Sequence, residues 1–180
     1  MRNIDRIKRV SGVIHFVLTV SIVFVVLIDV FYWVFLNDLP NSFIEVNTSS
    51  GALLNYTISP LIRLVGFGFS LLPVGAVLYA LINARTLFSF YKKGEVFSEH
   101  HVILFRRLAK SLIIIVITSI IYESAKSVIF SLGNPPGSRV LSVSFSSDDA
   151  MTLIMSSIIW VIAWVNDEGR TLSEDSELTI

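Results

Sequence analysis

The sequence has no cysteine and carries little charge. Only 16% of its 180 residues are charged, compared with about 25% in a typical soluble domain. The absence of cysteine excludes a disulfide-stapled secreted domain, and a 53% share of hydrophobic residues excludes a disordered segment. Scarce charge and long apolar blocks also exclude an ordinary soluble enzyme of this size. The composition therefore indicates a membrane protein.

Four apolar blocks are long enough, or nearly so, to cross a bilayer. A helix needs roughly 20 mostly apolar residues to span a hydrocarbon core of about 30 Å. Its backbone polar groups must also be satisfied within the segment, which favours helices. The sequence therefore predicts an all-α, membrane-embedded four-helix bundle that forms a single domain over residues 1–180. The expected spans are 12–36, 61–90, 108–132 and 150–166, with outer loops 37–60 and 133–149, an inner loop 91–107 and an acidic cytoplasmic tail 167–180.

Lys and Arg residues are unevenly distributed among the connections. Eleven of the 14 lie in the N-terminal tail, in residues 85–110 and in the C-terminal tail. Because short loops rich in these residues stay on the cytoplasmic side, both termini are predicted to be cytoplasmic. Aromatic residues near block ends, which favour the headgroup level, agree with this topology, although simple packing residues would give the same pattern. They are Tyr32, Trp33, Trp160 and Trp164.

The connections contain helix-ending and strand-like patterns. Gly94 predicts a helix stop, and Ser98 predicts the N-cap of a new helix that runs along the membrane surface from Glu99 to Lys110 and into the third span. Residues 146–149 predict the cap of the fourth helix, and residues 166–169 its end. Apolar residues alternate with serine from Val140 to Ser146, which predicts a short strand. That strand could pair with one from residues 37–60 to form a small extracytoplasmic β-cap.

Four ionisable residues fall within the outer parts of the apolar blocks: Asp29, Arg63, Glu123 and Lys126. A charge inside a span costs roughly 2.5–3.5 kcal/mol at its centre, so each of these needs a reason. Two acids and two bases sum to zero. They are read either as a neutralised cluster that fixes the register of the helices, or as a substrate, ion or proton site.

Motifs for catalysis or metal binding are missing. No glycine-rich phosphate loop, Ser/His/Asp order or zinc-ligand spacing occurs. Of the three histidines only His15 lies inside a span, so a haem held by two histidines is disfavoured. The basic residues lie at membrane edges and are read as topology determinants, not as a nucleic-acid surface. We expect no enzyme activity, no cofactor and no bound metal.

Two short segments resemble a known family. The first is the inner turn Lys93-Gly94-Glu95-Val96-Phe97-Ser98 with Arg106-Arg107 behind it, and the second is the acidic end Glu174-Asp175-Ser176-Glu177-Leu178-Thr179-Ile180. In these segments and in overall layout the chain resembles domain of unknown function 2975, a group of small bacterial four-span membrane proteins. It departs from the family where His100 or His101 replaces a frequent Asn. The resemblance implies a multi-pass protein of the bacterial inner membrane, with a small regulator as a plausible partner and no assigned catalytic residues.

The expected function is non-enzymatic. The specific-looking sequence lies in the inner turn and the tail, which predicts a membrane module that binds or regulates a cytoplasmic protein partner. Its interaction motif comprises Lys93, Gly94, Phe97, Ser98, Arg106 and Arg107. The alternative is a small oligomeric transporter or channel that uses Asp29, Glu123 and Lys126. The lipid bilayer is a partner in either case, and a homo-oligomer is compatible with both.

Overall fold

The computed structural model describes residues 2–39, 58–95, 98–132, 135–137 and 139–177. These residues form four helices, α1 (Arg2–Val34), α2 (Pro60–Lys93), α3 (Glu99–Ser131) and α4 (Ser147–Glu177). With 31 to 34 residues each, the helices are about 47–51 Å long. All four are long and apolar enough to cross a membrane. The expectation of an all-α chain with four membrane-capable helices is confirmed.

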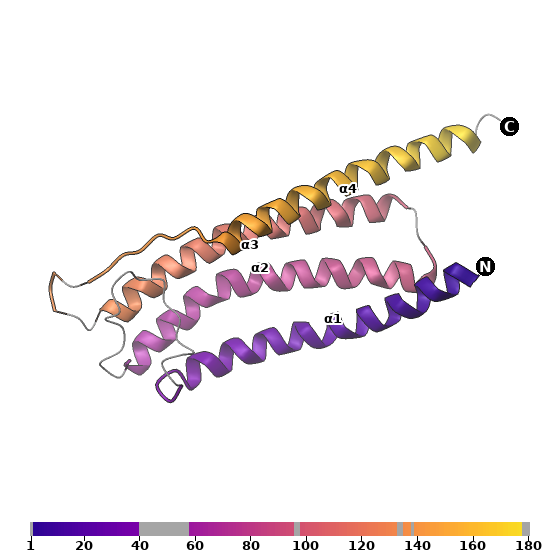
Figure 1. The fold of residues 1–180 in the computed structure, drawn as a ribbon. Helices are drawn as coiled ribbons and strands as arrows, with labels where there is room; N and C mark the ends of the chain where they lie inside the picture. Colours follow the sequence, from indigo (N-terminus) through magenta and orange to yellow (C-terminus); the bar gives the residue numbers. More distant parts are fainter. Residues whose placement is uncertain (1, 40–57, 96–97, 133–134, 138, 178–180) are drawn as a thin grey trace.

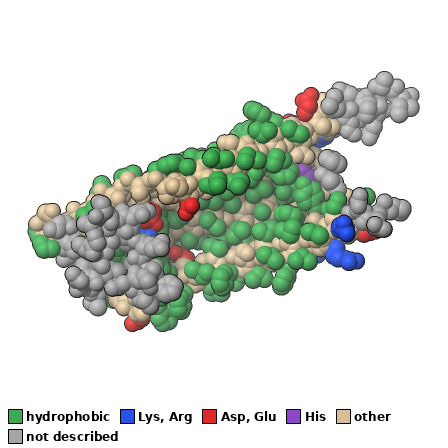
Figure 2. All heavy atoms as spheres, viewed as in Figure 1, with side chains coloured by type: hydrophobic (Ala, Val, Ile, Leu, Met, Phe, Trp, Pro, Cys, Tyr) green, Lys and Arg blue, Asp and Glu red, His purple; other side chains and the backbone are tan. Residues whose placement is uncertain are grey.

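The four helices form a bundle of open form. Each helix packs on the next in chain order, α1 on α2, α2 on α3 and α3 on α4, whereas α1 and α4 do not pack on each other within the described ranges. Figure 1 shows the consecutive helices running antiparallel, with both termini at the same end of the molecule. Apolar side chains cover the helices between the two ends (Figure 2). This exposed apolar surface suits a lipid environment.

Local sequence explains most helix ends. Ser59 caps α2 by accepting a hydrogen bond from the Ile62 backbone N–H at 3.4 Å, ahead of Pro60 at the first helical position. Gly94 ends α2 in the left-handed conformation, at φ 89°, where glycine avoids the Cβ penalty. Before α4, the Ser146 N–H donates to Asp149 Oδ2 at 2.7 Å, and the Asp149 N–H donates to Ser146 Oγ at 3.1 Å. The predicted stop at Gly94 and cap at residues 146–149 are confirmed.

The predicted strand at residues 140–146 is wrong. No strand is present among the described residues, and residues 139–146 form an extended segment along α3. Serines of α3 hold it there: Ser131 Oγ bonds both the N–H and the C=O of Val140 at 3.1 Å, and Ser127 Oγ accepts the Ser142 N–H at 2.9 Å. The other half of the proposed β-cap, residues 40–57, lies outside the described residues. Alternation here reflects a chain lying on a helix, with serines inward and large apolar residues outward.

Two further expectations need correction. Residues 166–169 do not end the fourth helix, since α4 continues to Glu177; a single glycine within a helix costs only about 1 kcal/mol and does not force an end. Trp33 is not a headgroup-facing residue, because only 3% of it is exposed. It packs instead in a small core with Leu36, Ile58 and Phe130 at the end of the bundle opposite the termini.

Candidate functional site

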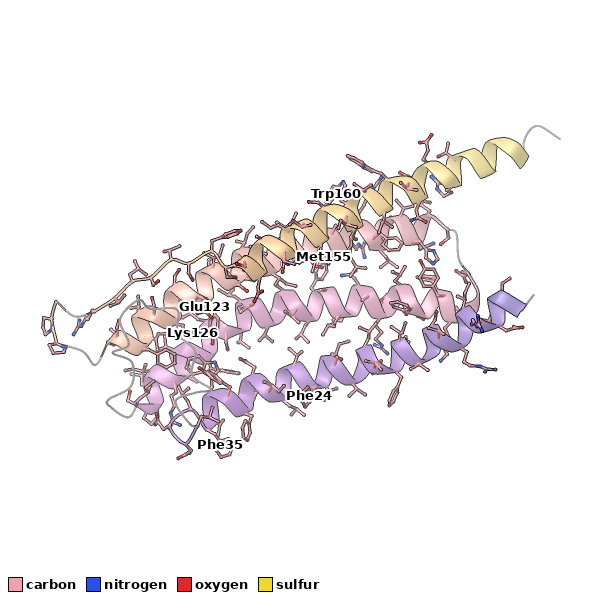
Figure 3. The ribbon with its side chains drawn as sticks, viewed as in Figure 1. Phe24, Phe35, Glu123, Lys126, Met155 and Trp160 are labelled. Atoms are coloured by element: carbon pink, nitrogen blue, oxygen red, sulfur yellow. The ribbon has the colours of Figure 1, made fainter. Side chains whose placement is uncertain are left out.

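The predicted intramembrane charges lie at the end of the bundle opposite the termini. Glu123 and Lys126 form an ion pair on one face of α3, with Lys126 Nζ 2.7 Å from Glu123 Oε1. Figure 3 shows the two side chains next to each other on that helix. Lys126 Nζ also lies 5.4 Å from the centre of the Tyr122 ring. The lysine is therefore stabilised by a carboxylate and by an aromatic face.

Asp29 joins α1 to α2 at the same end. Ser70 Oγ donates a hydrogen bond to Asp29 Oδ2 at 3.0 Å. Asp29 forms no ion pair with another described residue. Tyr122 of α3 packs against the small core that contains Trp33 and Leu36 at this end. Asp29, Ser70, Tyr122, Glu123 and Lys126 thus constitute one group across three helices, which we call the outer polar cluster.

Arg63 does not belong to this cluster. Its Nη1 donates to the backbone carbonyl of Val34 at 2.9 Å and so satisfies a carbonyl at the last residue of α1. No ion pair joins it to Glu123 or Asp29 in the part of the chain that the structure describes. The four-charge neutral set expected from the sequence is therefore divided into a Glu123–Lys126 pair, an Asp29–Ser70 pair and an isolated Arg63.

The outer polar cluster lies about one hydrocarbon thickness from the basic start of α1. Arg9 and Asp29 are twenty residues apart on α1, which corresponds to about 30 Å of helix and equals the thickness of a hydrocarbon core. The helix ends beyond Asp29 would then lie among the headgroups.

At the other end, the turn between α2 and α3 packs on the start of α1. A Cβ placed on Gly94 would meet the side chains of Lys8 and Ile4. His101 is 1% exposed and lies between the turn and the rings of Phe90 and Tyr91, with centroids 5.7 and 4.8 Å away. The end of α2 therefore lies against the start of α1, and the first turn of α3 lies against the end of α2.

Ser98 is the N-cap of α3, but it does not cap through its side chain to the backbone. Its hydroxyl lies 2.7 Å from His101 Nδ1 instead. The interaction occupies the Ncap–N3 spacing of a capping box, with histidine in place of the usual Glu or Gln. The expectation that Ser98 begins the helix is confirmed, and the buried histidine is its partner.

A charged link joins α3 to α4 near the same end. Arg106 Nη2 lies 2.7 Å from Asp167 Oδ2, and Arg170 Nη2 lies 3.5 Å from Asp167 Oδ1. Both partners of the first pair are more than a third exposed, so it contributes only about 0–1 kcal/mol to stability. Its effect is to hold the basic start of α3 beside the acidic end of α4.

The remaining motif residues differ in their surroundings. Lys93 Nζ lies 5.6 Å from the centre of the Phe90 ring, Arg107 is exposed, and Phe97 lies outside the described residues. Together with the Arg106 link, these side chains give this end a basic surface beside an acidic helix. No group of three His, Cys, Asp or Glu residues that could hold a metal is present in the described ranges.

Sequence reasoning missed the partners more than the charges. The sequence assigns no role to Ser70 or Tyr122, yet both belong to the outer polar cluster. Asp167 received no role. The available signal was depth: counted from the ends of the predicted spans 12–36, 61–90 and 108–132, Asp29, Ser70 and Glu123 lie seven to nine residues in, at about the same level.

Comparison with known proteins gives a family but no activity. The family model described as "Protein of unknown function (DUF2975)" matches residues 48–180. No curated protein and no solved structure matches the chain. The match covers the last three helices and includes both segments on which the sequence resemblance depends.

Proposed function

The chain belongs to the DUF2975 family, whose function is unknown, and from that premise we propose that it is a non-enzymatic membrane module that binds a cytoplasmic protein. The binding surface comprises the turn between α2 and α3, the basic start of α3 and the end of α4. We further propose that this end faces the cytoplasm of a bacterium and that the spans lie in its inner membrane, because the Lys and Arg residues gather there.

One observation carries the proposal: α4 continues as a helix past its apolar part. Asp167 is paired with Arg106, and ten more helical residues follow it, to Glu177, a length of about 15 Å. Figure 1 shows this part of α4 projecting beyond the turn between α2 and α3. A helix that only spanned the bilayer would not need this extension. The sequence of this extension is acidic, so together with the basic start of α3 it offers a protein partner charges of both signs.

Site-specific photocrosslinking tests the partner. A photoreactive amino acid at exposed Thr171, on the α4 extension, and at exposed Arg107 is expected to capture the same protein in living cells. Leu141 is 69% exposed at the opposite end and serves as the matched control, with no such product expected. Replacing Glu174, Asp175 and Glu177 with their amides should lower the yield at Thr171 several-fold, because the charge complementarity is lost. Products that contain only lipid, or identical products from Leu141, would contradict the proposal.

The orientation has a separate test that uses the absence of native cysteine. A single cysteine at Thr171 should react with a membrane-impermeant maleimide only after cells are opened. A single cysteine at Arg139, the exposed first residue of the extended segment, should react in intact cells. The expected difference in labelling is at least tenfold in each case, since the bilayer excludes the reagent. Labelling of Thr171→Cys in intact cells would indicate the opposite orientation and contradict the proposal.

A transporter or channel is the second candidate. Asp29 favours it, because this acid lies between α1 and α2 with a serine hydroxyl as its hydrogen-bond partner and is not neutralised by an ion pair with any described residue. Acids within membrane helices often take part in proton or ion pathways. This candidate requires flux that depends on Asp29 and on Glu123 separately.

A further inference from the structure

A groove with apolar walls runs between α1 and α2 at the end opposite the termini. Its volume is about 370 Å³, within the range of small-molecule sites, about 300–1,000 Å³. Val30 and Val34 of α1 form one side, and Leu64 and Phe67 of α2 form the other. Leu64 is 66% exposed, so the groove is open toward the surrounding lipid. Any occupant must therefore present apolar surface to these walls.

Arg63 supplies the only charged side chain among the described residues that line the groove. Its Nη1 donates to the Val34 carbonyl, and its Nε atom is buried without a hydrogen-bond partner in the described part of the protein. The guanidinium keeps its positive charge, which attracts a phosphate group. The groove thus combines apolar walls with one cationic side chain.

The depth of Arg63 matches a lipid headgroup. Arg63 lies seven residues beyond Ser70 toward the start of α2, or about 10 Å along the helix. Since Ser70 contacts Asp29 at the proposed hydrocarbon boundary, Arg63 falls in the headgroup region, whereas Val30 and Phe67 lie closer to the hydrocarbon. A phosphate at Arg63 would place an attached acyl chain directly on the apolar walls.

A second hollow lies on α1, nearer the middle of that helix. Its volume is about 320 Å³, and Val20, Val23 and Leu27 contribute to its lining. At 100° per residue these three positions fall within about 80° of Val30 around the helix axis. The two hollows therefore lie on the same side of α1.

We propose that the α1–α2 groove binds one phosphate-bearing lipid of the adjacent leaflet, with its phosphate on Arg63 and an acyl chain along Val30 and Phe67. Charge complementarity selects this occupant over a neutral lipid, and the apolar walls select it over free phosphate. The lipid would contact the last turn of α1 and the first turns of α2 together and so secure their packing at this end.

Native mass spectrometry of the full chain in detergent tests the site. The probes are phosphatidylglycerol, diacylglycerol with the same acyl chains, and inorganic phosphate. Phosphatidylglycerol is expected to bind at one molecule per chain, about tenfold more tightly than either of the other two. Arg63→Gln should weaken phosphatidylglycerol binding about tenfold. The matched control Arg85→Gln, an exposed arginine near the other end of α2, should leave it unchanged.

Arg63→Gln also removes the hydrogen bond to Val34 and could disturb folding, so a second pair of variants tests the groove without changing Arg63. Leu64→Trp fills the groove without altering Arg63 and should also weaken phosphatidylglycerol binding several-fold. Leu71→Trp, at an exposed position outside the groove lining, should not. Equal binding of phosphatidylglycerol and diacylglycerol would mean ordinary boundary lipid and would overturn the proposal. Equal binding of inorganic phosphate, or equal effects of the Arg63 and Arg85 variants, would also overturn it.

Discussion

Gly66→Ala is expected to destabilise the protein by about 1–3 kcal/mol, the usual cost of overpacking a close-fitted interior. A Cβ on Gly66 would overlap the six-membered ring of Trp33. The indole cannot move aside easily, because it is 3% exposed and stacks on Phe130 with ring centroids 6.4 Å apart. Equilibrium unfolding in mixed micelles, followed by circular dichroism, measures the change in the free energy of unfolding.

Gly68→Ala is the matched control, since nothing lies within 4 Å of a Cβ at that position of the same helix. It should leave stability unchanged or raise it by up to about 1 kcal/mol, because alanine favours a helix over glycine. Trp33→Phe in the Gly66→Ala background removes the ring atoms that clash and should recover part of the loss, with a coupling of about 0.5–3 kcal/mol. Equal stabilities of Gly66→Ala and Gly68→Ala would show that Trp33 does not pack against Gly66.

The helices could be predicted from the sequence because their signals are local. Apolar blocks of sufficient length give the four spans, Gly94 gives the end of α2, and residues 146–149 give the cap of α4. Contacts between helices were not predictable in the same way. Periodicity along α1 shows that Asp29 lies on a polar stripe, but it does not show that Ser70 of α2 lies opposite. The partner of Arg63 is a backbone carbonyl, which a count of charged residues cannot reveal.

The strand prediction failed for a physical reason that applies beyond this chain. An alternating segment has one polar and one apolar side, and the pattern alone does not say what each side contacts. Here Ser127 and Ser131 of α3 provide the hydrogen bonds that a neighbouring strand would have supplied. Leu141, Val143 and Phe145 remain 60–71% exposed. Those side chains therefore face lipid or headgroups, and the alternation is kept without any sheet.

Lys126→Met should be more damaging than removal of both members of the ion pair. The Lys126 and Glu123 side chains are only 10% and 27% exposed, so the variant leaves a carboxylate without its cation in a poorly hydrated place. Removing one partner of a buried ion pair lowers the free energy of unfolding by about 3–5 kcal/mol, whereas replacing both partners with apolar residues often leaves it nearly unchanged. Because Glu123 retains some exposure, we expect a loss near 3 kcal/mol for Lys126→Met and less than about 1 kcal/mol for Glu123→Gln with Lys126→Met. The same unfolding titration measures both.

Flux measurements on stable variants then separate a structural pair from a transport site. Glu123→Gln with Lys126→Met is the suitable background, since it removes the charges without leaving one unpaired. Asp29→Asn keeps a group that can accept the Ser70 hydrogen bond. Proteoliposomes containing a pH-sensitive dye report proton entry for each variant. If Asp29→Asn and the charge-free pair each abolish proton flux that the unaltered chain supports, the outer polar cluster belongs to a transport pathway. If the unaltered chain shows no proton flux and the stability difference above is found, Glu123 and Lys126 serve to fix α3 in the bundle.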